Sequence, residues 1–258
     1  KKDGVAVDWP VRYKEIEPWY DKVEEYIGVS GQNLGLKHFP DQKLLKPMEL
    51  NCVEEHLQSK ISENFDDERV LTIGRTAHIT EGTKEGLGRS TCQYRSRCMR
   101  GCPYGAYFSS NSSTLPAADA TGNMTLRPNS IVHEVMYDDT TKQATGVRVI
   151  DAETKEIHVF SAKVVFLCAS SIASASILLQ SKSERFPNGL GNDSGELGHN
   201  IMDHHFHVGA TATAEGYDDK YVKGRRPNGI YIPRFRNLGG NTTMKSFKRG
   251  YGYQGGAS

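Results

Sequence analysis

Apolar residues recur at helical spacing in two segments near the beginning of the chain. The first segment predicts a helix that begins at Glu17-Pro18, because proline is tolerated in a first turn, and that ends at Gly28. Its periodic positions are Ile16, Trp19, Val23 and Ile27. The second segment predicts a helix from near Pro47, with one apolar face made by Leu50, Val53, Leu57, Ile61 and Phe65. The Trp and Tyr residues of the first helix are expected in the core.

The middle of the chain has the clearest strand pattern. Apolar alternation bounded by polar turns predicts an antiparallel meander of strands at Ile131–Tyr137, Gly146–Ile150 and Ile157–Phe160. The fully apolar run Val164–Leu167 predicts a buried strand, and the small residues after it open a helix at Ile172–Gln180. In a doubly wound sheet, such a strand-to-helix turn lets the backbone approach a nucleotide.

Shorter strands are predicted on either side of the meander. Arg69–Arg75 reads as a strand, and the glycine-rich segment Thr80–Thr91 reads as a loop that leads to a group of cysteines. Tyr231–Phe235 and Tyr251–Tyr253 read as strands of a different sheet. Gly189–Gly195 is one residue too long for G-x-G-x-x-G and does not follow a strand, so it predicts a turn.

Size and charge restrict the class of protein. A chain of 258 residues can bury a core and form one to two domains. Lys+Arg 32 against Asp+Glu 31 gives a net charge of +1, without the sequence-wide basic field of a nucleic-acid binder. Apolar runs fall short of the about 18 residues of a membrane span. Lys1-Lys2-Asp3-Gly4 is not followed by the apolar stretch of a signal peptide.

A cluster of three cysteines is the strongest chemical signal. The pattern Cys92-x5-Cys98-x3-Cys102-Pro103 places three thiolates on one loop, where they can bind a soft metal. Its C-x3-C-P ending also closes the cysteine run of bacterial ferredoxins, which ligates iron–sulfur clusters. Arginines that can offset the negative charge of such a cluster stand between the thiols: Arg95, Arg97 and Arg100.

Other interpretations of these residues stay open. A structural zinc ion needs a fourth ligand, and the C-x2-C pairs of a zinc ribbon are missing. The thiols can also be unmetallated or disulfide-bonded. Separately, Asp203, His205 and His207 would share one face of a strand and can be a two-His, one-carboxylate metal site. Hydrogen-bonded structural histidines are the commoner outcome for such a segment.

Several segments together carry a family resemblance: Asp8-Trp9-Pro10 with Pro18-Trp19-Tyr20, Cys92 to Ala117, Ser130-Ile131-Val132, and Val164 to His204. In these segments the chain resembles the glucose-methanol-choline (GMC) flavoprotein oxidoreductases. It is most similar to bacterial sugar and polyol dehydrogenases such as the large subunits of gluconate and FAD-dependent glucose dehydrogenases. The block Gly101–Ala106 is specific to that subgroup.

The resemblance implies a mixed α/β fold. Part of the chain would belong to an FAD-binding, Rossmann-like three-layer domain with a β-meander, and part to an antiparallel-sheet substrate domain. The implied divisions are a substrate-side or cap segment at 1–91, the cysteine loop with the middle of the FAD-binding domain at 92–200, and the start of the substrate-binding sheet at 201–258.

The resemblance also implies cofactor residues. Three thiolates suffice for a three-iron, four-sulfur cluster, whose ligands would be Cys92, Cys98 and Cys102. The residues implied at the FAD are Val132, beside the adenine, and Cys168, Ala169 and Ser170, at the strand-to-helix turn beside the adenosine moiety. The chain departs from the family pattern at Gln93, where some relatives have a second cysteine, and at the turn, which often contains glycine.

Two family motifs are missing from the sequence: the amino-terminal G-x-G-x-x-G and the carboxy-terminal His with its His or Asn partner. No catalytic residue is therefore assigned, and the catalytic base is expected on the carboxy-terminal side of this segment. We expect the chain to be an internal fragment of a longer protein, inactive and weak in FAD binding by itself.

The function implied by the resemblance is FAD-dependent oxidation of a CH–OH group of a sugar, glycoside or polyol. Electrons would pass through the iron–sulfur cluster to an external acceptor. The implied partners are the substrate, a small subunit, and a cytochrome or other acceptor, in the periplasm. The alternatives are a zinc-stabilised binding module without a redox role and a non-haem iron enzyme built on Asp203, His205 and His207.

Overall fold

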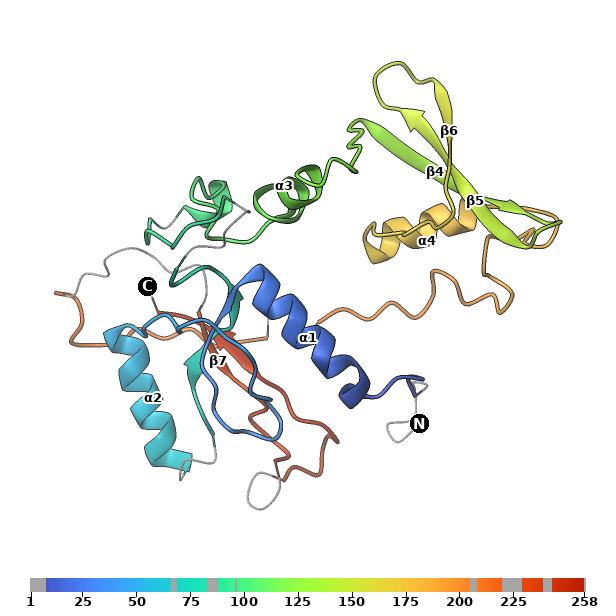
Figure 1. The fold of residues 1–258 in the computed structure, drawn as a ribbon. Helices are drawn as coiled ribbons and strands as arrows, with labels where there is room; N and C mark the ends of the chain where they lie inside the picture. Colours follow the sequence, from blue (N-terminus) through green and yellow to red (C-terminus); the bar gives the residue numbers. More distant parts are fainter. Residues whose placement is uncertain are drawn as a thin grey trace. The chain divides into compact units, whose positions relative to one another are not determined.

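The structure, a computed structural model, forms two compact units of mixed helix and antiparallel sheet. It describes residues 8–65, 69–82, 88–95, 97–204, 208–219, 229–238 and 243–257. Unit 1 combines Lys1–Met124 with Ala212–Ser258, and unit 2 is Thr125–Thr211. Figure 1 shows helices from the amino-terminal half and a strand from the carboxy-terminal part of the chain in unit 1, and a three-stranded sheet with one helix in unit 2. The expected fold class, mixed α/β with a meander, is confirmed.

Helix α1 spans Tyr13–Ile27 and so begins earlier than predicted. The carboxylate of Glu15 accepts the backbone N–H of Arg12 at 2.6 Å, which satisfies one of the free donors of the first turn. Pro18 therefore lies inside the helix rather than at its start. Gly28 ends the helix as predicted, with a left-handed φ of 74° that glycine adopts without strain.

The aromatic side chains of α1 are exposed, contrary to the expectation that they are core. Trp19 is 62 % exposed and Tyr20 is 50 % exposed. Helical spacing determines which residues share a face, but whether another element covers that face depends on tertiary packing. The expectation was wrong for this reason.

Helix α2 spans Cys52–Phe65 and packs beside a three-stranded sheet. The side chain of Asn51 accepts the backbone N–H of Glu54 at 3.0 Å and caps the helix, which explains a start later than Pro47. The sheet has the order β2-β7-β8, with β2 at Thr72–Ile73, β7 at Ile230–Ile232 and β8 at Tyr253–Gly255. Both pairings are antiparallel. Buried Ile61, Leu71 and Ile232 form the core between helix and sheet.

The remaining elements of unit 1 are short. They are β1 at Val29–Ser30, β3 at Thr76–Ala77, the 3-10 helices η1 at Cys98–Arg100 and η2 at Ser110–Ser112, and α3 at Thr114–Asp119. Strands β1 and β3 pair antiparallel. A second core cluster lies beside them and is made by Met48, Ile73, Ile79, Cys92 and Ala106.

Unit 2 is built on the predicted meander. Strand β4 is Ser130–Asp138, β5 is Gln143–Asp151 and β6 is Ile157–Ser161, all antiparallel in the order β4-β5-β6. The turns form because an aspartate at each strand end accepts backbone N–H groups, as Asp138 does from Thr140 at 2.8 Å. The prediction of this sheet is confirmed.

Helix α4, at Ser171–Gln180, packs against β4. Just after the helix, the hydroxyl of Ser181 accepts the backbone N–H of Val135 at 2.8 Å and donates to the carbonyl of Ile177 at 2.7 Å. The hydroxyl of Ser181 therefore links the end of α4 to β4, and the helix packs as a layer on the meander.

The segment Val164–Leu167 is not a buried strand, and that prediction was wrong. It carries no strand assignment, Val164 is 64 % exposed and Phe166 is 82 % exposed. A strand needs a neighbour to accept its backbone hydrogen bonds. The described strands of unit 2 pair with one another, and this apolar segment belongs to none of the sheets.

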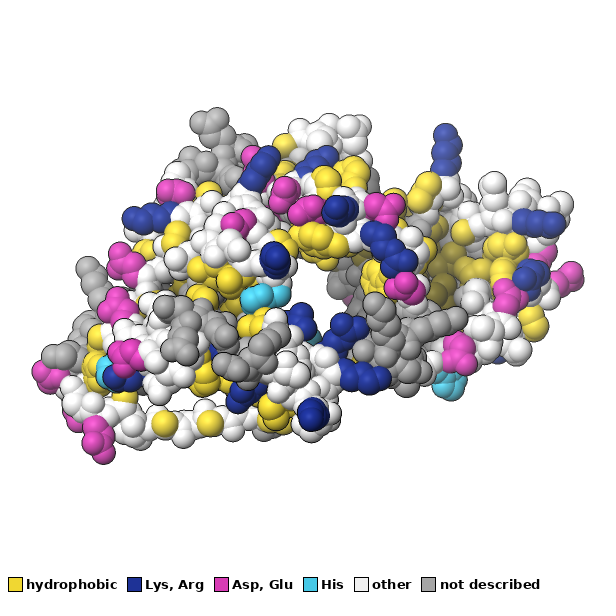
Figure 2. Space-filling model, turned by 90° about the horizontal axis from the view of Figure 1, so that it is seen from below, with side chains coloured by type: hydrophobic (Ala, Val, Ile, Leu, Met, Phe, Trp, Pro, Cys, Tyr) yellow, Lys and Arg dark blue, Asp and Glu magenta, His cyan; other side chains and the backbone are white. Residues whose placement is uncertain are grey.

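Charge is distributed without a single-sign field on the face drawn in Figure 2, where acidic and basic side chains both occur. This agrees with the net charge of +1. Among the residues that the structure describes, no helix is both long and apolar enough to cross a membrane.

Candidate metal and cofactor sites

The cysteine segment is held closed at its two ends. The backbone N–H of Cys92 donates to the carbonyl of Ile79 at 2.8 Å, and the N–H of Ile79 donates to the carbonyl of Ala106 at 3.0 Å. The N–H of Ser90 donates to the carbonyl of Tyr104 at 2.8 Å. Ile79 therefore lies between the two ends of the cysteine segment and keeps them adjacent.

Two glycines shape this loop. Gly101 has a φ of 91° and its N–H donates to the carbonyl of Cys98 at 3.2 Å, which ends η1. Gly105 has a φ of 60° and its N–H donates to the carbonyl of Cys102 at 3.1 Å, closing a turn that contains Pro103. These turns fold the chain back on itself, which cysteines at this spacing need if they are to bind one common metal group.

All three cysteines of the cluster line one pocket of about 300 Å³, its open mouth included. Cys92 is buried, Cys98 and Cys102 are half-buried, and all are free thiols. The sulfur of Cys92 accepts the backbone N–H of Tyr94 at 3.4 Å. The structure thus brings together the three residues that the sequence predicts as metal ligands.

Burial favours the protonated form of two of these thiols, those of Cys92 and Cys98. It raises the pKa of Cys92, and it raises the pKa of Cys98, to which the neighbouring Cys92 and Cys102 also contribute. Because the thiolate is the metal ligand, a metal that binds here must displace protons. A soft metal centre that gains three thiolate bonds can do so.

Two of the three arginines predicted near the thiols line the same pocket. Arg95 and Arg97 are pocket residues, and the guanidinium of Arg95 lies 5.6 Å from the ring centre of Tyr104. Arg100 is exposed. The positive charges of Arg95 and Arg97 are placed to offset negative charge on a thiolate-bound group.

Buried Arg89 fastens the backbone that follows the cluster. It is 2 % exposed and donates hydrogen bonds to the carbonyls of Gly105 at 2.8 Å, Ala106 at 3.1 Å and Ile27 at 2.6 Å. Burial lowers its pKa, and the neighbouring Cys102 opposes that change. The side chain connects the cysteine loop to the end of α1.

A buried histidine also lines the cysteine pocket. His78 is 0 % exposed, and neither ring nitrogen has a hydrogen-bond partner within the described parts of the chain. Burial, with Arg89 nearby, lowers the pKa of His78 to about 4. The imidazole is therefore neutral near pH 7.

The described residues contain no ligand group for a single metal ion. In the ranges the structure describes, no three His, Cys, Asp or Glu side chains are grouped to hold one ion. His205 and His207 lie outside the described residues, while Asp203 accepts the backbone N–H of His204 at 2.7 Å.

The residues predicted at the FAD lie in unit 2. Val132 is half-buried on β4, opposite Val149 of β5 and next to an irregularity in the strand pairing. The three residues before α4 are all exposed: Cys168, Ala169 and Ser170. The hydroxyl of Ser170 accepts the N–H of Ala173 at 3.3 Å and caps α4, so the turn opens a helix as predicted.

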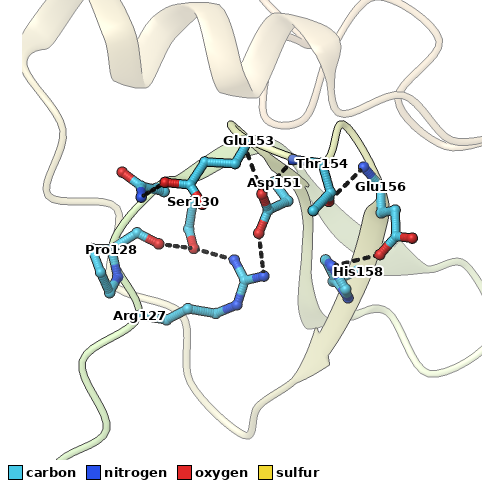
Figure 3. Close-up of polar contacts among 9 residues, drawn as sticks. Arg127, Pro128, Ser130, Asp151, Glu153, Thr154, Glu156 and His158 are labelled. Carbon is cyan, nitrogen blue, oxygen red and sulfur yellow. Dashed lines mark hydrogen bonds and ion pairs between the residues drawn. The ribbon is translucent and has the colours of Figure 1, made fainter.

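A polar cluster fixes the start of β4, as Figure 3 shows. The guanidinium of Arg127 donates to the carboxylate of Asp151 at 2.7 Å and to the hydroxyl of Ser130. Asp151 also accepts the backbone N–H groups of Thr154 and Glu153, and these bonds lower its pKa to about 2. The cluster joins the chain entering β4 to the β5–β6 turn and sets the strand that carries Val132.

Sequence reasoning missed His78 and Arg89. His78 stands between Ala77 and Ile79, and Arg89 stands in a glycine-rich segment. Neither residue is part of a spaced motif that would indicate a functional site. What makes them notable is nearly complete burial, which depends on tertiary packing. The one signal in the sequence was the position of Arg89 shortly before Cys92.

The family comparison matches residues 6–206 to the GMC oxidoreductases, a range that includes the cysteine loop, the meander and α4. The chain is 28% identical over 264 residues to the 2-methyl-1,2-propanediol dehydrogenase of Mycolicibacterium austroafricanum, covering 96% of this chain and 43% of the relative. It is 26% identical to the fructose dehydrogenase large subunit of Gluconobacter japonicus, covering 78% of this chain and 36% of the relative.

The gluconate 2-dehydrogenase flavoprotein of Pantoea cypripedii is also 26% identical, over 77% of this chain and 35% of the relative. The chain therefore spans less than half the length of these relatives. The resemblance to sugar and polyol dehydrogenases within the GMC family is confirmed.

Proposed function

The chain belongs to the GMC oxidoreductase family, whose members imply FAD as cofactor, and from that premise we propose a specific activity for the protein that contains it. The protein oxidises a CH–OH group of a sugar, glycoside or polyol. Its electrons leave through an iron–sulfur cluster bound by Cys92, Cys98 and Cys102 and pass to an external acceptor. The alcohol carbon loses a hydride and its oxygen loses a proton, which gives a carbonyl.

The observation that carries the electron route is the convergence of three free cysteines on one pocket. Thiols that served only as small apolar residues would not need to share a pocket with Arg95 and Arg97. Thiolates and arginines together form a site for a negatively charged, sulfur-rich group.

FAD, when bound, accepts the hydride, and the cluster accepts electrons one at a time. The residues of this chain bind and orient these groups. Val132 on β4 and the turn Cys168–Ser170 would hold the adenosine moiety, and the polar cluster at Arg127 and Asp151 holds the start of β4 in place. Arg89 holds the loop that supplies the thiolates.

The whole protein is proposed to work with partners. A small subunit and a cytochrome or other acceptor receive the electrons, as befits relatives named as a large subunit and as a flavoprotein. The catalytic base is proposed to lie outside this segment. The names of the relatives support the proposed substrate class, since they name a diol, fructose and gluconate as substrates.

The experiment uses the full-length protein and its Cys98→Ser variant. A serine hydroxyl is a harder and much less acidic ligand than a cysteine thiol and is a poor substitute for a thiolate on iron, so we expect the cluster to be lost while FAD stays bound. Substrate should then still bleach the flavin under anaerobic conditions at the parent rate. Turnover with a one-electron acceptor should fall at least about tenfold, because only the exit route is cut.

The matched control is Cys52→Ser, which changes an exposed free cysteine on α2. This variant should keep both rates at the parent level. If Cys98→Ser also keeps both rates, or if the parent protein contains zinc and no iron, the proposed electron route is wrong.

A further inference from the structure

His78 lines the cysteine pocket and has no role in the proposed function so far. Its imidazole is completely buried, and both ring nitrogens are unpartnered within the described residues. A buried polar group without a partner costs free energy, so native proteins rarely keep one without a reason. A phenylalanine would fill the same space without that cost.

The backbone fixes where the imidazole points. His78 forms an isolated bridge with Tyr107, and the ring centres of the two residues lie 5.2 Å apart. The next residue, Ile79, accepts the backbone N–H of Cys92 at 2.8 Å. His78 thus stands beside the first cysteine of the loop and lines the pocket with all three thiols.

Tyr107 does not satisfy this side chain. The two rings pack against each other with their planes tilted by 36°. In the described parts of the chain, neither nitrogen of the imidazole forms a hydrogen bond. Arg89 is a cation and offers donors only, so it cannot accept a hydrogen bond from the imidazole, and three of its donors bind backbone carbonyls. Among the described residues, then, the imidazole N–H has no acceptor, and a group bound in the pocket would supply one.

We infer that His78 donates a hydrogen bond from its imidazole to a sulfur atom of the iron–sulfur group in the cysteine pocket and thereby raises the reduction potential of that group. An imidazole carries at least one N–H in every common protonation state, so the donor is always present. Hydrogen bonds to cluster sulfurs stabilise the reduced, more negative form and set the potential. His78 is thus a positioning and tuning residue, and this inference rests on the proposed function.

The test compares the full-length protein with His78→Phe and His78→Gln. Phenylalanine keeps the ring against Tyr107 but has no donor, whereas glutamine restores an N–H of similar reach. The readouts are iron and acid-labile sulfide content, the electron paramagnetic resonance signal of the cluster, and its midpoint potential in a redox titration. The control is His56→Phe, an exposed histidine on α2.

We expect His78→Phe to retain iron and sulfide, to shift the midpoint potential downward and to alter the resonance signal. His78→Gln should return the potential towards the parent value, and His56→Phe should leave it unchanged. Loss of the cluster in His78→Phe with retention in His78→Gln also supports a required donor.

An unchanged potential in a cluster-bearing His78→Phe protein overturns the inference. So does loss of the cluster in both variants, which would assign His78 to ligation or folding. A parent protein without iron and sulfide is a different result, because it refutes the proposed electron route itself, and the role of His78 with it.

Discussion

Replacing Arg89 with methionine should destabilise the unit that carries the cysteine loop. The guanidinium is 2 % exposed and donates to three backbone carbonyls, those of Gly105, Ala106 and Ile27, at 2.6 to 3.1 Å. Methionine has a similar length and fits an apolar space, but it has no donor. The substitution therefore removes the hydrogen bonds while leaving most of the packing.

The size of the effect follows from what the carbonyls retain. The carbonyl of Ala106 still accepts the N–H of Ile79 at 3.0 Å. The carbonyls of Gly105 and Ile27 receive no other hydrogen bond from the described residues, and each orphaned acceptor costs roughly 1–3 kcal/mol. Removing a buried guanidinium also relieves its desolvation, so we expect a net loss of about 2–4 kcal/mol.

The assay is denaturant unfolding of the full-length protein, with the transition midpoint and slope compared between variants. Arg12→Met is the matched control, because Arg12 is exposed and pairs with exposed Asp8, and such pairs contribute about 0–1 kcal/mol. The variant Arg89→Met should also lose iron more readily in a chelator. If its midpoint equals that of Arg12→Met, the three hydrogen bonds do not hold the loop, and the reasoning is refuted.

Two further changes test the meander. Asp151 accepts the N–H of Thr154, and this bond helps to lower its pKa to about 2. The stabilisation by the ionised carboxylate is therefore complete above about pH 4 and is lost as the pH falls through 2. Asp151→Asn should lower the unfolding midpoint at pH 7 but not at pH 2. Equal differences at both pH values would contradict this. A Cβ at Gly146 would lie 2.1 Å from the carbonyl oxygen of Phe160, so Gly146→Ala should lower the free energy of unfolding by about 1–3 kcal/mol. The control is Gly209→Ala, where a Cβ meets open space and the free energy of unfolding should change by less than about 0.5 kcal/mol. Similar losses in both glycine variants would show that the close approach is not the cause.

Local signals made the meander and its turns predictable. Strands β4, β5 and β6 follow one another with short connections, and Asp138 and Asp151 direct the turns between them through bonds within three residues. The end of α1 was predictable for the same reason, since a left-handed glycine at position 28 is required locally. That the three cysteines line one pocket was predictable because they lie close together in the sequence.

Features that depend on distant packing were not predictable. Val164–Leu167 has the composition of a buried strand, but a strand forms only where a neighbour accepts its hydrogen bonds. Trp19 has helical spacing with other apolar residues, yet it is 62 % exposed. The roles of His78 and Arg89 arise from burial among segments far apart in the sequence, which no local pattern records.

The most direct test of the central claim is the iron, acid-labile sulfide and zinc content of the full-length protein and of its Cys98→Ser variant. Three thiolates on one pocket predict iron and sulfide in the three-to-four ratio of the expected cluster in the parent protein, with both lost in the variant and FAD retained. Zinc without iron, or iron and sulfide that persist after Cys98 is replaced, would contradict a cluster bound by Cys92, Cys98 and Cys102.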